Sequence, residues 1–211
     1  NAEAAEATAK ELGVMVVKGN VGSFDDCARA VRQAVQQGAD VIKTASTGGV
    51  MSDTAAGLGQ QMSDAELLSI VETAHRLGRK VAAHAHGTDG VNAALRAGVD
   101  SVEHGTYLDA ESIRLFKAKG SYLVPTLLAG DTVTRQAETA EWMPATVRAK
   151  ARIVGPLMID AVRRALVTSP PRVTQVTPTV AAAGTTPVMI VNNSFVSTIT
   201  EAVKPGVISR D

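Results

Sequence analysis

The sequence has few of the residues that would indicate a disulfide-rich, nucleic-acid-binding or membrane-spanning protein. Cys27 is the only cysteine among 211 residues, which excludes an internal disulfide and a zinc site built from cysteines. Lysine plus arginine equals aspartate plus glutamate at 21 each, so no basic surface indicates a nucleic acid partner. No apolar run approaches the roughly 20 residues of a membrane-spanning helix. These absences favour a small-molecule partner.

An initiator methionine and an apolar leader are also missing. The opening NAEAAEATAKELG is polar and rich in alanine, without the apolar centre of a signal peptide. We therefore expect the chain to begin within a longer protein, and the compartment stays open between cytoplasmic and periplasmic or secreted. The hydrophobic content of 45% is enough to build a globular core.

From Ser23 onward one plan repeats four times: an amphipathic helix, a glycine that ends it, and a short β-branched strand. Ser63 and Glu66 form a capping-box pattern at the start of the second helix. The glycines are Gly38, Gly78, Gly98 and Gly120, and the strands that follow them are ADVIK, KVAAH, VDSVEH and SYLVPT. Strands that alternate with helices predict a parallel sheet in an α/β fold.

Polar residues stand at the C-terminal ends of successive strands, where barrel enzymes place their chemistry. They are Lys43, His84, His104 and Thr126. A complete (β/α)8 barrel of the TIM type takes about 250 residues in eight units. Residues 1–166 hold about half of these units, so we predict a partial barrel.

A composition change near Val167 predicts a domain boundary. Before it, Ala145 to Leu166 read as one helix, which we expect Pro156 to kink. After it, residues 167–211 hold five of the eight prolines, no histidine and hardly any charge. We interpret this segment as an atypical tail, disordered or forming a few irregular strands, and a reading-frame shift is our hypothesis for its origin.

Three of the four histidines lie within 21 residues, at or just past strand ends. His84 and His104 are one helix-strand unit apart, so neighbouring strands would direct both rings to one point, as a zinc site requires. His86 lies further along the loop after His84, and we predict that it contacts substrate. His75, in the last turn of a helix, needs no functional explanation. Glu103 should point away from His104 because strand residues alternate, and it receives no role.

Lys43 ends an apolar strand, where an ammonium group is costly to bury, so we expect poor solvation and a lowered pKa. Two functions are compatible with such a lysine. A neutral amine can form a Schiff base with a carbonyl, or it can take up carbon dioxide and bridge two metal ions as a carbamate. The following TGG could offer backbone N–H groups to an anion.

Three segments together resemble the metal-dependent amidohydrolase superfamily, in its branch of imidazolonepropionase-related proteins and Xaa-Pro or Xaa-Arg/Lys dipeptidases. They are ADVIKTASTGGVMSD, GRKVAAHAHGTDGVNAALRAGVDSVEHGTYLD and YLVPTLLAG. The resemblance implies a distorted (β/α)8 barrel, of which this chain holds about strands four to seven. It also implies two zinc ions, bridged by carboxylated Lys43 and held by His84 and His104. His86 stands where relatives often have a tyrosine near the substrate.

The resemblance further implies hydrolysis of an amide bond in a dipeptide or N-acyl amino acid. Two family features are missing: a His-x-His strand, which would lie before Asn1, and a Gly-Thr-Asp strand after Leu166. No aspartate of this chain matches the family's proton-transferring residue, so the catalytic residue stays unknown. We therefore expect the chain as written to bind metal weakly and to turn over little.

Two alternatives stay open. IKTASTGG also resembles the Schiff-base strand of class I aldolases such as deoxyribose-phosphate aldolase, which would explain Lys43 but none of the three clustered histidines. Borohydride trapping of an aldehyde on Lys43 would separate the aldolase from the hydrolase. The third possibility is a non-catalytic half-barrel that binds a partner or forms homo-oligomers through its open sheet edges.

Overall fold

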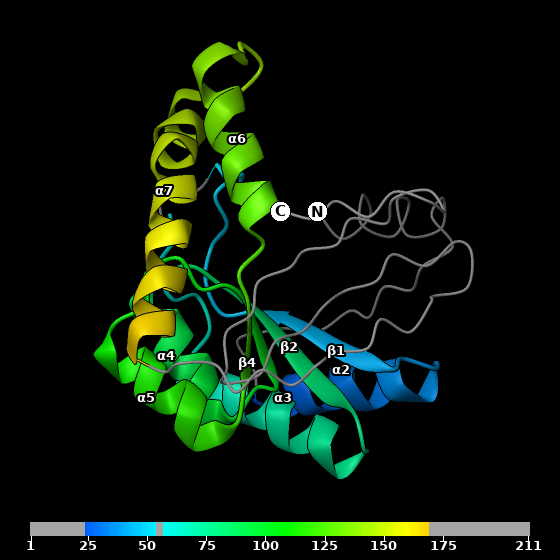
Figure 1. Ribbon diagram of the computed structural model, residues 1–211. Helices are drawn as coiled ribbons and strands as arrows, with labels where there is room; N and C mark the ends of the chain where they lie inside the picture. The colour runs from blue at the N-terminus through cyan, green and yellow to red at the C-terminus, as the bar shows by residue number, and fades with distance from the viewer. Residues whose placement is uncertain (1–23, 54–56, 169–211) are drawn as a thin grey trace, which may run out of the picture.

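The computed structural model describes residues 24–53 and 57–168, which form a parallel sheet covered by helices (Figure 1). The described strands are β1 (Val41–Ala45), β2 (Lys80–Ala85), β3 (Ser101–His104) and β4 (Tyr122–Val124), paired in this order and all parallel. Helix α2 (Phe24–Gln36) precedes β1, and α3 (Asp64–Arg76), α4 (Thr88–Ala97) and α5 (Ala110–Lys119) connect successive strands. The predicted α/β fold is confirmed.

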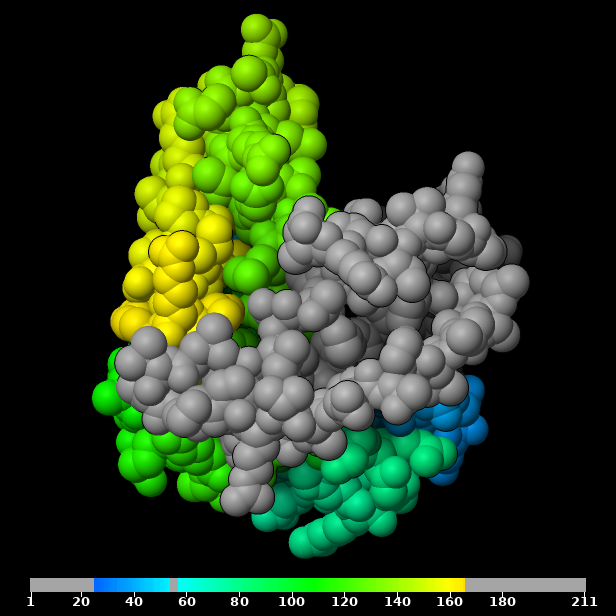
Figure 2. All heavy atoms as spheres, in the orientation of Figure 1, coloured from blue at the N-terminus to red at the C-terminus, as the bar shows by residue number. Residues whose placement is uncertain are grey.

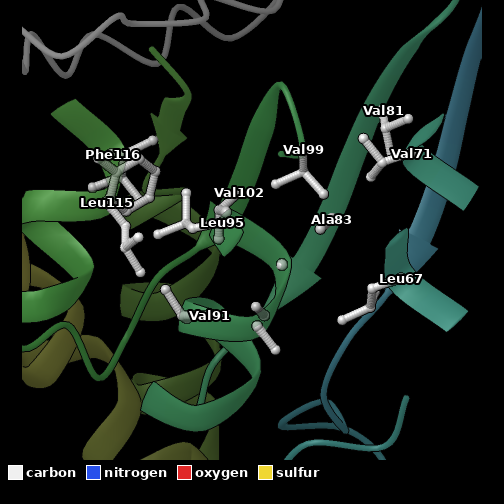
Figure 3. Close-up of a cluster of buried hydrophobic side chains, with 14 of the residues drawn as sticks. Leu67, Val71, Val81, Ala83, Val91, Leu95, Val99, Val102, Leu115 and Phe116 are labelled. Carbon is white, nitrogen blue, oxygen red and sulfur yellow. The ribbon is translucent and has the colours of Figure 1, made fainter. Parts of the chain in front are cut away.

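The main core lies between the sheet and the connecting helices, where small and branched side chains from both layers meet (Figure 3). The strand residues that face the helices are fully buried, among them Val81 and Ala83 of β2 and Val102 of β3. Their neighbours along each strand point to the other face of the sheet. Leu67 and Leu95 pack onto them from α3 and α4. The helices thus cover one face of the sheet and leave the other for polar side chains.

Helix ends follow the signals in the sequence. Ser63 caps α3 in the predicted capping box, because its side chain accepts the backbone N–H of Glu66 and Glu66 reaches back to the Ser63 N–H. Gly98 and Gly120 end α4 and α5 with left-handed backbones at φ 94° and 69°, which glycine adopts without a Cβ clash. The sharp stops keep each loop short and bring each strand back beside the previous one.

The last two helices form a hairpin that the repeating plan does not predict. Helix α6 (Leu127–Thr139) begins directly after β4, and α7 (Ala145–Thr168) runs two residues beyond the predicted end at Leu166. The hairpin extends beyond the C-terminal ends of the strands (Figure 1), and Figure 2 shows it projecting from the rest of the described residues. A Cβ on Gly130 would lie 2.6 Å from the Met158 sulfur, so this glycine lets α6 and α7 approach closely.

The predicted tail beyond residue 168 lies outside the described residues, so the domain boundary stays a prediction. Of the helices that the structure describes, none combines the length and apolar character that crossing a bilayer requires.

Asp100 connects three elements at the N-terminal ends of the strands. Its carboxylate accepts hydrogen bonds from Lys80 Nζ at 2.6 Å, His75 Nε2 at 2.7 Å and the Val81 N–H at 2.8 Å. Burial alone would raise the pKa of Asp100, but these hydrogen bonds outweigh it and hold the pKa below its ordinary value. The charged form therefore stabilises the fold.

We expect Asp100→Asn to lower the free energy of unfolding at pH 7 by about 1.5 kcal/mol, the lower end for hydrogen bonds to a charged group because Lys80 is exposed. Because the folded-state pKa is lowered, this stabilisation is complete above the unfolded-state pKa and is lost as the pH falls through the folded-state value. Urea unfolding at pH 7 and pH 3 should show the two proteins converging at low pH. Asp131→Asn, which breaks an exposed pair with Arg135, should cost less than about 0.5 kcal/mol at both pH values.

Candidate metal centre

Three histidines meet at the C-terminal edge of β2 and β3. His84 is the next-to-last residue of β2, His86 follows that strand, and His104 is the last residue of β3. The ring centroids of His84 lie 4.8 Å from His86 and 4.6 Å from His104, and those of His86 and His104 lie 4.6 Å apart. One nitrogen from each ring lies within 4.8 Å of the others. The predicted convergence of His84 and His104 is thus observed, and His86 joins them.

The three rings line a pocket of about 330 Å³. One wall comes from the loop after β1, where a Cβ added at Gly49 would lie 3.5 Å from the His84 ring. Another wall comes from the α6–α7 hairpin. The sequence pattern predicts α7 but not α6, whose N-cap Thr126 has a left-handed backbone and makes no side-chain capping hydrogen bond. The hairpin residues in the lining are Ala129, Gly130, Val133, Val154 and Met158. The pocket is therefore mostly apolar around a cluster of imidazoles.

Two threonines orient two of the rings. His86 Nδ1 lies 2.7 Å from the hydroxyl of Thr106, and His104 Nδ1 lies 2.6 Å from the hydroxyl of Thr126. Each threonine belongs to the loop after the next strand. Metal-binding histidines commonly use one ring nitrogen for such a partner and the other for the ion. His84 Nε2 lies 3.3 Å from the Gly48 carbonyl oxygen.

His104 has a left-handed backbone with φ 74°, which is uncommon for a residue with a Cβ. The regular alternation predicted for Glu103 and His104 does not hold at His104. Its left-handed backbone brings the His104 ring beside that of His84, whereas regular strand geometry would leave it on the opposite face. Glu103 precedes it in regular strand geometry and pairs in register with His84. Strained backbone of this kind is concentrated at functional sites.

Burial keeps all three imidazoles uncharged near neutral pH. Loss of hydration is the main cause that lowers the pKa of His86 to about 3 and that of His104 to about 4, followed by repulsion from neighbouring histidines and from Lys150 and Lys43, respectively. The pKa of His84 is also lowered, chiefly by burial. Neutral imidazole is the form that ligates a metal ion, and three imidazoles suit zinc or a similar divalent transition metal.

The structure corrects part of what the sequence predicts for Lys43, namely its place at a strand end and its poor solvation. It lies in the middle of β1, not at its end, and its side chain is 54% exposed, because β1 is an edge strand of the described sheet. Its ammonium group forms an ion pair with Glu103 across the sheet. The pKa of Lys43 is lowered by partial burial, in the expected direction. Lys43 lines a separate pocket of about 510 Å³ beside α2 and β1, not the histidine pocket.

Gly48, in the loop after β1, uses its backbone N–H to hold the loop together. The Gly48 N–H donates to the Gly59 carbonyl oxygen at 3.2 Å, so it is not available to an anion. Lys150, from α7, donates to the Gly49 and Ser52 carbonyl oxygens and ties the hairpin to this loop. His75 stays outside the cluster, on Asp100.

A family model places these residues in context. The model of the amidohydrolase family matches residues 2–166, which is most of the chain and includes every residue of the histidine cluster. The chain belongs to the amidohydrolase family. The resemblance stated from the sequence motifs is therefore confirmed.

Relatives within the amidohydrolase family include ochratoxinase from Aspergillus niger, 45% identical over 102 residues, which are 48% of this chain and 21% of the relative. A crystal structure of that ochratoxinase superposes with a TM-score of 0.61 at 34% identity, covering 69% of this chain and 32% of the other. A Xaa-Pro dipeptidase with bound methionine gives a TM-score of 0.65 at 41% identity, covering 71% and 36% of the two chains. A putative prolidase from Bifidobacterium longum gives 0.63 at 32% identity, covering 72% and 38%.

The chain thus spans about a fifth of the curated ochratoxinase and about a third of the solved amidohydrolases. Together with the parallel sheet, these matches confirm the predicted partial barrel of the TIM type. The roles predicted for Lys43, His84, His86 and His104 stay predictions.

Proposed function

We propose that the protein hydrolyses an amide bond in a dipeptide or N-acyl amino acid, with two zinc ions bridged by carboxylated Lys43. The observation that carries this proposal is the histidine cluster at the C-terminal strand edge of an amidohydrolase chain. A Xaa-Pro dipeptidase and a putative prolidase among the similar structures support a short peptide substrate.

The residues of the chain divide the work between holding ions and enclosing substrate. His84 and His104 supply neutral imidazoles, and Thr126 holds the His104 ring in place. Bound divalent ions would polarise the scissile carbonyl and lower the pKa of an attacking water. Val133 and Met158 present apolar surface to the substrate side chains and keep bulk water away. No carboxylate of residues 24–53 or 57–168 lines the pocket, and we assign no proton-transferring residue.

Lys43 must leave Glu103 before it can serve as a bridge. As an ammonium ion it carries the wrong charge for a metal ligand, and carboxylation would turn it into an anion. The ion pair does not separate the hydrolase from the aldolase alternative, because a Schiff base and a carbamate both form from a neutral amine. The histidine cluster weakens the aldolase alternative, because a Schiff-base lysine has no use for three clustered imidazoles. Membership of the amidohydrolase family supports a small-molecule substrate.

The test is hydrolysis by the protein expressed from its full reading frame with zinc and bicarbonate. We expect chelator-sensitive release of the C-terminal amino acid from a panel of Xaa-Pro and Xaa-Arg dipeptides, N-acyl amino acids and ochratoxin. His84→Asn should lower kcat/KM by about 100-fold or more, equivalent to about 2.7 kcal/mol. His75→Asn, outside the cluster, is the control and should stay within about twofold of the parent protein. Hydrolysis that resists chelation, or that survives His84→Asn, would contradict the proposal.

A further inference from the structure

The geometry points to a metal centre that does not require Lys43. We infer that this chain binds one divalent transition-metal ion through His84, His86 and His104, so that His86 is a ligand of that ion. The inference deepens the proposed function and rests on its metal dependence. It differs in the residues that hold the first ion and in requiring no carbon dioxide.

The first support is the placement of the three ligand atoms. Zinc binds histidine nitrogen at 2.0–2.1 Å, so tetrahedral ligands lie about 3.4 Å from each other. The nitrogens of His84, His86 and His104 lie within 4.8 Å of one another without an ion. Closing a three-histidine site requires the His86 and His104 rings, whose planes are 11° apart, to turn until their in-plane nitrogen lone pairs converge, and a fourth position would stay open for water or substrate.

The second support is the orientation of His86. Its side chain is buried, with 4% of the residue exposed, and its ring centroid lies 4.6 Å from that of His104. The Thr106 hydroxyl engages Nδ1 in the same way that Thr126 engages Nδ1 of His104. The surroundings of His86 are thus like those of His104, which the family resemblance implies to be a metal ligand. This similarity favours a ligand role for His86 over a contact with substrate alone.

The third support is the position of Lys43. It pairs with Glu103 and lines the pocket beside α2, whereas all three histidines line the pocket under the α6–α7 hairpin. The charge of Lys43 still reaches His84 and His104, where it contributes to their lowered pKa values. Binding through the histidines leaves this ion pair intact. Binding through Lys43 requires the pair to break and the amine to be carboxylated. The histidine centre is therefore the one that can load first.

The experiment is a cobalt titration of the 211-residue chain in bicarbonate-free buffer, followed by visible absorption and by the metal content after dialysis. We expect one cobalt ion per chain. His86→Asn should weaken binding by more than about 100-fold, since loss of even an outer hydrogen-bond partner typically costs 10–100-fold. Lys43→Met and the control His75→Asn should stay within about threefold of the parent chain. Unchanged affinity in His86→Asn, or a requirement for Lys43 or bicarbonate, would overturn the inference.

Circular dichroism of each variant shows whether it folds. If His86→Asn does not, X-ray absorption of the zinc-loaded parent chain counts the imidazole ligands directly, with three expected and two contradicting the inference. The result is separate from the fate of the proposed function. A chain that binds one ion through three histidines while the full protein cleaves no substrate of the panel would overturn the hydrolase proposal alone.

Discussion

Replacing Phe116 with alanine should destabilise the fold by about 3–5 kcal/mol, the range for removing a buried aromatic ring. Phe116 is 1% exposed on α5 and belongs to the core cluster between the helices and the sheet (Figure 3). The loss is large because only 3% of the residues are aromatic, so few other side chains of comparable size fill the core. Such a change approaches the whole stability of an ordinary domain.

Urea unfolding followed by circular dichroism measures the effect. Trp142→Ala is the matched control, because it also removes a large aromatic side chain, but one that is 66% exposed at the turn between α6 and α7. We expect the control to change the free energy of unfolding by about 0.5 kcal/mol or less. A Phe116→Ala protein as stable as the control would show that the sheet core does not carry the stability assigned to it.

The second large effect is expected at Gly48. A Cβ there would lie 1.9 Å from the Gly57 carbonyl oxygen, which is backbone and cannot swing aside as a side chain would. We expect Gly48→Ala to cost about 3 kcal/mol or more, the upper part of the range for overpacking. The change should also weaken cobalt binding, because the Gly48 carbonyl is the contact of His84 Nε2.

Gly49→Ala is the matched control for this loop. Its Cβ would meet Ser52 Oγ at 3.4 Å and the His84 ring at 3.5 Å, both ordinary contacts. Urea unfolding and the cobalt titration should therefore separate the two neighbouring glycines. Equal effects of both substitutions would show that the loop adapts to a side chain at either position.

Regular repetition made most of the fold predictable. Period-3.6 helices, glycine stops such as Gly98 and a capping box at Ser63 are local signals, and each depends on only a few neighbouring residues. Parallel pairing then follows from the alternation of helices and strands. The placement of His84 and His104 at one edge needed only one further step, because parallel strands end at the same edge. The meeting of their rings also depends on the left-handed backbone of His104.

The features that were missed depend on contacts between distant residues. Helix α6 begins at Leu127, after a threonine with a left-handed backbone that makes no capping hydrogen bond, so no local signal marks it. Alternation fails at His104 because its φ is positive, a backbone state that sequence does not announce in a residue other than glycine. The exposure of Lys43 depends on what lies beside the edge of β1, which the sequence of the strand itself does not specify.

The threonine contacts of the histidines cross from one strand-helix unit to the next. Thr106 follows β3 and holds a ring that follows β2, while Thr126 follows β4 and holds a ring that ends β3. The backbone N–H of His86 in turn donates to the hydroxyl oxygen of Thr47, in the loop after β1. Correct ring orientation therefore requires four consecutive units to be folded together. The segment that must fold cooperatively to form this centre therefore runs at least from Thr47 to Thr126, well beyond the segment from His84 to His104 that contains its histidines.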